Sequence, residues 1–195
     1  MPNRPYSEAW LAELKLIAQR MDPRIVDLWV WLLGIIMFET AGTCAPDICA
    51  GGKRWEDLAP AIRRKLGVGL IQFTQVGIEE LKARYSHSNL VAGLTKARLV
   101  SMTQMDQLPY VELYFGMYRT ALRTLPEPTI EDYYAAVLWP AAIGRGPDFV
   151  LMDEARQVIQ YKANHLLDCN SDHLITLREA AAGPRRCAGL PALAA

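Results

Sequence analysis

Apolar residues recur along most of the chain at three- and four-residue spacing, which predicts helices. Ser7 is a favoured N-cap residue and Glu8 suits a first turn, so the first helix is predicted to start here. Its apolar face is formed by Trp10, Leu11, Leu14 and Ile17. Residues 23–40 form the next predicted helix, which is apolar nearly all round and is therefore expected to lie in the core.

The remaining pattern is also mainly helical. Helices are predicted over residues 55–66, 76–83, 105–123, 129–138 and 150–162, with a short helical segment starting at Thr95. The glycine-rich residues 41–53 favour a loop, and the apolar residues 67–74 fit a short strand or turn. The sequence therefore predicts a mainly α fold in a single domain, residues 1–183, followed by a flexible tail, residues 184–195.

Charge and hydropathy exclude several classes of protein. The 195 residues carry 21 basic and 21 acidic side chains, and without a basic excess we expect no nucleic-acid partner. The most apolar run, residues 25–38, is too short to cross a bilayer and lies too far from Met1 for a signal peptide. We therefore expect a protein that is made in the cytoplasm and is not an integral membrane protein.

The four cysteines fall into two pairs along the chain, Cys44 with Cys49 and Cys169 with Cys187. No CxxC spacing is present, and the three histidines do not cluster with the cysteines, so a zinc site is not expected. Each pair fits either a disulfide in an oxidising compartment or two thiols in a reducing one.

Two segments hold candidate chemistry. Glu39 ends the most apolar predicted helix, where loss of water would raise its pKa into the range of a general acid at neutral pH. The alternatives are an ion pair with a basic side chain, or a helix end that reaches solvent. Further on, Gly69 permits close approach of the backbone to a ligand, and the Gln72 amide suits an acetamido group. The alternative there is a buried strand edge.

Together these segments resemble the lysozyme-like lytic transglycosylases, most closely the short forms carried by phage tails and by some bacterial antagonism systems. The resemblance rests on IMFETAGT over residues 36–43, a variable insert, and GLIQF over residues 69–73. It continues over residues 132–144, DYYAAVLWPAAIG, which are similar to a phage-type variant of the third family segment. It covers about residues 25–165.

The resemblance implies a goose-type or soluble lytic transglycosylase-like fold with Glu39 as the catalytic acid/base. The implied sugar-binding groove is lined by Gly69, Leu70, Ile71, Gln72 and Phe73. Trp139-Pro140 replaces the family's Tyr-Asn pair, which leaves Tyr133 and Tyr134 as candidates for the hydrogen bond to the acid. The implied reaction is cleavage of peptidoglycan glycan strands between MurNAc and GlcNAc.

Two mechanisms of cleavage stay open. A hydrolase needs a second carboxylate, and the nearest in sequence are Asp47, Glu56 and Asp57, none in a recognisable motif. With a single acid, the substrate's own N-acetyl group can stabilise the oxocarbenium-like centre, and Glu39 then takes the C6 hydroxyl proton to leave an anhydro sugar. We favour this lytic route. A non-catalytic wall- or virion-binding module on the same scaffold is the alternative from another class.

Residues 168–179 have the oxygen-rich spacing of an EF-hand loop. The ligand positions fall on Asp168, Asn170, Asp172, the Leu174 carbonyl, Thr176 and Glu179. His173 stands where glycine normally makes the sharp turn, so it would need a positive φ angle. The spacing predicts a structural Ca²⁺ site; the alternative is a loop whose Asp and Asn residues cap the next helix. No organic cofactor is expected.

A wall-degrading enzyme without a signal peptide must be released by lysis, by a phage tail or by a secretion system. It would then act in the periplasm or on the cell wall. A toxic effector of this kind would need an immunity or inhibitor protein that plugs the groove. The expected partners are therefore peptidoglycan glycan strands and such an inhibitor.

Overall fold

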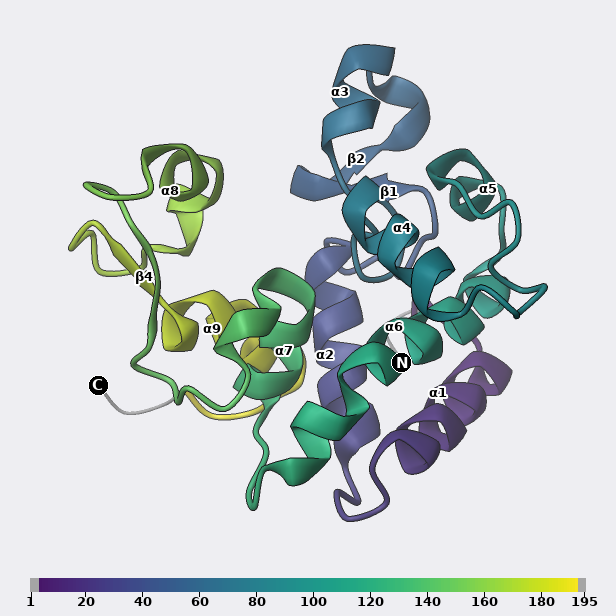
Figure 1. Ribbon diagram of the computed structural model, residues 1–195, viewed down its shortest axis with the longest axis horizontal. Helices are drawn as coiled ribbons and strands as arrows, with labels where there is room; N and C mark the ends of the chain where they lie inside the picture. The colour runs from purple at the N-terminus through teal and green to yellow at the C-terminus, as the bar shows by residue number, and fades with distance from the viewer. Residues whose placement is uncertain (1–3, 193–195) are drawn as a thin grey trace.

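The computed structural model describes residues 4–192 and places nine α-helices and two small antiparallel sheets in them (Figure 1). The helices are α1 (Glu8–Met21), α2 (Leu28–Glu39), α3 (Pro60–Lys65), α4 (Gln75–Arg84), α5 (Lys96–Val100), α6 (Gln104–Thr124), α7 (Ile130–Leu138), α8 (Val158–Asn164) and α9 (Leu177–Cys187). The strands are β1 (Ile48–Cys49), paired with β2 (Lys53–Arg54), and β3 (Val150–Asp153), paired with β4 (Leu174–Thr176). The predicted mainly α class is confirmed.

Helix α2 lies in the middle of the molecule, with α1 and α6 on one side and α7 and α9 on the other (Figure 1). Its Leu28, Leu32, Ile35 and Ile36 side chains are fully buried, as the all-round apolar pattern predicts. Burial of each such side chain contributes about 1.5–3 kcal/mol, so α2 is the main packing element of the core. No helix within residues 4–192 is long and apolar enough to span a membrane.

Short polar side chains fix the helix starts. The Ser7 and Thr95 side chains accept hydrogen bonds from the first turns of α1 and α5. Capping boxes pair Thr103 with Asp106 in α6, Thr129 with Asp132 in α7, and Thr176 with Glu179 in α9. These caps act within four residues of sequence, which is why the predicted starts near Ser7, Thr95 and Thr129 are confirmed.

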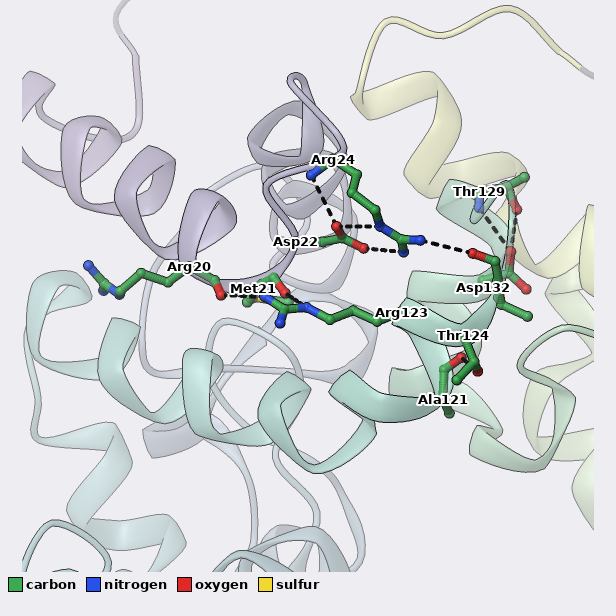
Figure 2. Close-up of polar contacts among 10 residues, drawn as sticks. Arg20, Met21, Asp22, Arg24, Ala121, Arg123, Thr124, Thr129 and Asp132 are labelled. Carbon is green, nitrogen blue, oxygen red and sulfur yellow. Dashed lines mark hydrogen bonds and ion pairs between the residues drawn. The ribbon is translucent and has the colours of Figure 1, made fainter.

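Helix α2 begins at Leu28, later than the predicted start at residue 23. The buried Asp22 carboxylate accepts hydrogen bonds from the backbone N–H of Arg24 at 3.1 Å and from its guanidinium at 2.6 and 2.9 Å. Figure 2 shows this pair beside Arg123 of α6, which donates to two carbonyl oxygens in the last turn of α1. A side-chain network therefore holds residues 23–27 in turns, and apolar spacing does not reveal it.

The helix predicted over residues 150–162 is wrong in its first part and confirmed over residues 158–162. Residues 150–153 form β3, and α8 begins only at Val158. Leu151 and Met152 are buried, and the strand that pairs with them is β4, far along the chain. Local spacing cannot identify so distant a partner, and the tertiary pairing overrides the helical pattern.

Prolines mark two further differences. The predicted helix over residues 55–66 is divided into a 3₁₀ turn, Trp55–Asp57, and α3, in which Pro60 takes the first position. Helix α9 continues through Pro184 to Cys187, so the prediction of a flexible tail from residue 184 is wrong for residues 184–187. Packing of α9 against α2 compensates for the hydrogen bond that Pro184 cannot donate. Residues 193–195 of the expected tail lie outside the described residues.

Candidate active site

Glu39 is the last residue of α2 and is half-buried. Loss of water around its carboxyl disfavours the charged form and raises the pKa of Glu39 to about 7. A hydrogen bond from the Tyr134 hydroxyl opposes this shift. No Lys or Arg in the described part of the chain is paired with Glu39. The carboxyl is thus desolvated although the residue as a whole is only half-buried, which is the environment of a general acid.

Tyr133 and Tyr134, the two candidate hydrogen-bond donors to Glu39, lie in different surroundings. Tyr134 is buried, and its ring packs edge-on against Phe38 with the centroids 5.8 Å apart. Burial, then the nearby charge of Glu39, raises the pKa of Tyr134 well above its usual value. Tyr133 lies instead against the rings of Trp31 and Phe115, because adjacent residues point about 100° apart around a helix. The structure therefore brings Tyr134, and not Tyr133, to Glu39.

Gln72 holds the end of α2 in place. Its amide nitrogen donates to the carbonyl oxygens of Glu39 and Ile48, both at 3.0 Å, and of Gly69 at 3.3 Å. The last carbonyls of a helix have no partner within it, so Gln72 satisfies one of them and ties α2 to β1. The amide nitrogen is committed to three backbone groups, whereas the amide oxygen is buried and has no hydrogen-bond partner within residues 4–192. The expected role of Gln72 in binding a sugar stays a prediction.

The neighbours of Gln72 are core residues. Leu70, Ile71 and Phe73 are at most 2% exposed, so their side chains belong to the core, and the expectation that this segment lines a sugar groove stays a prediction for its backbone. Gly69 has a φ angle of +85°, and a Cβ there would lie 2.5 Å from Oε1 of Gln107. Gln107 is fully buried, and its Oε1 accepts from the Leu70 N–H at 3.0 Å. The turn at residues 69–73 therefore needs glycine for close backbone packing.

Gln72→Ala is expected to lower the melting temperature by roughly 4–8 °C. Three hydrogen bonds to backbone carbonyls are lost, and their net contribution is about 2 kcal/mol. Thermal unfolding followed by circular dichroism measures the effect. Gln75→Ala is the control, since the Gln75 amide bonds only Glu79 at the exposed surface. Weaker glycan binding with an unchanged melting temperature would instead place Gln72 in the groove.

A cleft of about 900 Å³ opens between α4, α6 and the end of α7, and Glu39 is not one of its lining residues. We call it the α4–α6 cleft; its walls include Glu80, Arg84, Tyr114, Met117, Tyr118 and Leu138. Tyr114 connects it to Glu39: burial raises the pKa of Tyr114, and the charges of Glu80 and Glu39 add to the effect. The Tyr118 hydroxyl donates to Glu80. The cleft is large enough for a small ligand.

Glu80 is a carboxylate that sequence spacing did not single out. Of the three candidates that it did, Asp47 is paired with Arg54 at 2.6 Å, and Glu56 and Asp57 are exposed in a 3₁₀ turn. None of the three lines the α4–α6 cleft. Glu80 lies on one face of α4, eight residues beyond Gln72, and only the packing of α4 on α6 places it near Tyr118. No sequence motif could have identified it.

The loop at residues 168–179 joins α8 to α9 and turns as expected at His173, whose φ angle is +67°. Its side-chain carboxylates accept hydrogen bonds from backbone amides of the same loop. Asp168 accepts from the Ser171 and His173 amides, and Asp172 accepts from the Leu174 amide. Oxygen donors of this kind suit a hard cation. Among residues 4–192, however, no three His, Cys, Asp or Glu side chains are grouped around a point where a metal ion would sit.

All four cysteines are free thiols, so neither candidate disulfide is present. Cys44 and Cys49 are buried, and Cys169 and Cys187 are exposed. Burial raises the pKa of Cys44 to about 12, so this thiol is unreactive at neutral pH.

The chain matches no protein-family model, no curated protein and no solved structure. The fold and the site therefore define a mainly α protein, and its central helix ends in a desolvated carboxyl group. That carboxyl receives a hydrogen bond from Tyr134 and lies close to Tyr114, which lines an open cleft.

Proposed function

We propose that this protein is a lysozyme-like glycosidase that cleaves peptidoglycan glycan strands between MurNAc and GlcNAc, with Glu39 as general acid/base. The observation that carries the proposal is the placement of Glu39 at the end of the central helix α2, where loss of water raises the pKa of its carboxyl to about 7. Enzymes that cleave glycosidic bonds need one carboxylic acid that stays protonated near neutral pH. The resemblance of residues 36–43 and 69–73 to lytic transglycosylases supports the choice of substrate.

The favoured reaction is lytic transglycosylation. Protonated Glu39 gives its proton to the glycosidic oxygen, the bond to C1 breaks, and the substrate's N-acetyl oxygen stabilises the positive centre. The Glu39 carboxylate then takes the proton of the C6 hydroxyl, whose oxygen bonds to C1. The products are a free hydroxyl on the leaving sugar and a 1,6-anhydro end on the other. The Tyr134 hydroxyl stabilises the carboxylate between the two proton transfers.

Hydrolysis is the second candidate, and the position of Glu80 in the α4–α6 cleft favours it. A second carboxylate could orient a water molecule toward C1 in place of the C6 hydroxyl. Glu80 is held by Tyr118 and shares the cleft wall with Tyr114, which lies near Glu39. Asp47 is less suited to this role because its carboxylate is paired with Arg54.

The test is digestion of purified sacculi followed by analysis of the new glycan ends. Anhydro ends support the lytic route, and reducing ends support hydrolysis. Under hydrolysis, Glu80→Gln should remove most reducing ends, while Glu79→Gln, outside the cleft on the same helix, should not. No new ends at all would reject both reactions and leave a non-catalytic wall- or virion-binding module.

As an effector, the protein would be delivered to the periplasm or cell wall by a phage or secretion system and be blocked by an inhibitor protein.

Residues 168–179 are proposed to bind a structural Ca²⁺ ion. A ligand that binds only the native state raises the melting temperature, and we expect a rise of a few degrees in millimolar calcium over chelator. Mg²⁺ should substitute poorly, because it demands tighter octahedral geometry. Asp168→Ala and Glu179→Ala should abolish the rise, and Glu127→Ala, on the exposed α6–α7 turn, should keep it. Identical melting curves in calcium and chelator would leave these residues as helix caps.

A further inference from the structure

Two glycines let α9 approach α2 closely. A Cβ on Gly34 of α2 would lie 2.6 Å from both the Pro184 carbonyl oxygen and the Ala188 Cβ. A Cβ on Gly183 of α9 would overlap the ring of Phe38, far inside the 3.0 Å that real Cβ atoms keep. Neither glycine has a positive φ angle, and glycine weakens a helix interior by about 1 kcal/mol. Packing, and not backbone conformation, therefore explains both.

The contact at Gly183 leads directly to the acid. Phe38 precedes Glu39 in α2, and its ring fills the space that a side chain at residue 183 would need. Tyr134 packs edge-on against the same Phe38 ring, at an interplanar angle of 84°. Tyr134 is the residue whose hydroxyl donates to Glu39. Three elements, α9, α2 and α7, thus meet at Phe38.

We infer that Gly183 is a positioning residue for Glu39, acting through Phe38 and Tyr134. The missing side chain at residue 183 leaves the Phe38 ring where it supports Tyr134, and Tyr134 in turn orients the carboxyl. The inference deepens the proposed function, because it names what holds the acid. Within residues 4–192, the other ionisable group that faces Glu39 is Tyr114 of α6, whose ring pairs with Phe73, Phe115 and Tyr118.

The experiment is titration of the Glu39 carboxyl by NMR in wild type, Gly183→Ala and Gly34→Ala. The added methyl at residue 183 should displace Phe38 and weaken the Tyr134 bond, so the pKa of Glu39 should rise by about one unit. Gly34→Ala crowds the same two helices more than one turn before Glu39. It should lower the melting temperature as well but leave the pKa of Glu39 unchanged. Equal pKa values in wild type and Gly183→Ala would overturn the inference.

Phe38→Leu provides the second arm and guards against a misfolded Gly183→Ala variant. The smaller side chain removes the clash, so adding Gly183→Ala to Phe38→Leu should shift the pKa of Glu39 no further. Phe38→Leu alone should raise it, since Tyr134 loses its support. A full further shift in the double variant, or none in Phe38→Leu, contradicts the proposed route.

Activity gives an independent readout. Glycan cleavage by Gly183→Ala should fall about ten- to a hundredfold, as expected for a misplaced catalytic group, with the alkaline limb of its pH profile moved upward. If the wild type cleaves no glycan, the proposed function fails, yet the NMR titrations still decide whether Gly183 positions Glu39.

Discussion

Glu39→Gln is expected to reduce glycan cleavage by a factor of about 10²–10⁴, the usual contribution of a general acid–base group. The amide has the same shape as the carboxyl but can neither give the proton to the glycosidic oxygen nor take one from the C6 hydroxyl. Release of soluble fragments from purified sacculi measures the rate. Because the acid form is the one that starts the reaction, wild-type activity should also fall as pH rises above about 7, the pKa of Glu39.

The matched controls are Glu79→Gln, at an exposed position, and Glu13→Gln, at a half-buried position paired with Arg20; both lie outside the cleft. Both should retain wild-type activity, and circular dichroism should show that all three variants fold. A Glu39→Gln protein that keeps more than half of the wild-type rate would remove Glu39 from the mechanism. An alkaline limb far from neutrality would show that another group supplies the proton.

The same substitution is expected to stabilise the protein at high pH. The pKa of Glu39 is raised from 4.5 to about 7 on folding, so the folded state binds more protons than the unfolded state between these values. Its contribution to stability is full below pH 4.5 and is lost as pH rises to about 7. Allowing for the partial exposure of Glu39, the loss is about 1–3 kcal/mol. Glu39→Gln lacks this loss because the amide does not ionise.

Denaturant unfolding of wild type and Glu39→Gln at pH 5 and pH 8.5 tests this. The difference in the free energy of unfolding between the two proteins should favour the variant by about 1–3 kcal/mol more at pH 8.5 than at pH 5. Subtracting the wild type cancels the titration of every other group. A difference that is the same at both pH values would show that the carboxyl of Glu39 is not desolvated, and would weaken the proposed function with it.

The sequence alone determined the elements whose signals are local. Ser7, Thr95 and Thr129 each bond an amide or a carboxylate within four residues, so the helix starts are encoded where they occur. An all-round apolar helix can only be buried, which fixed α2 in the core. The end of that helix at Glu39 made a raised pKa one of three interpretations of the sequence, and the packing around Glu39 selected it.

The tertiary structure decided which side chains serve the site and which serve the core. Tyr133 and Tyr134 are adjacent in sequence, and only the docking of α7 against α2 selected Tyr134. Gln72 is of a residue type that can bind sugars, yet its amide nitrogen donates to the carbonyl oxygens of Glu39 and Ile48, more than twenty residues away. Such partners depend on how distant segments fold together, and residue type cannot reveal them.

Long-range packing likewise decided β3, the length of α9 and the position of Glu80. Residues 150–153 become a strand because β4 supplies their hydrogen bonds, and α9 continues past Pro184 because α2 provides a surface for it. Glu80 reaches the α4–α6 cleft through contacts between helices far apart in the chain. Local patterns encode helix propensity, caps and burial, whereas strand partners and the convergence of polar groups arise only when the whole chain packs.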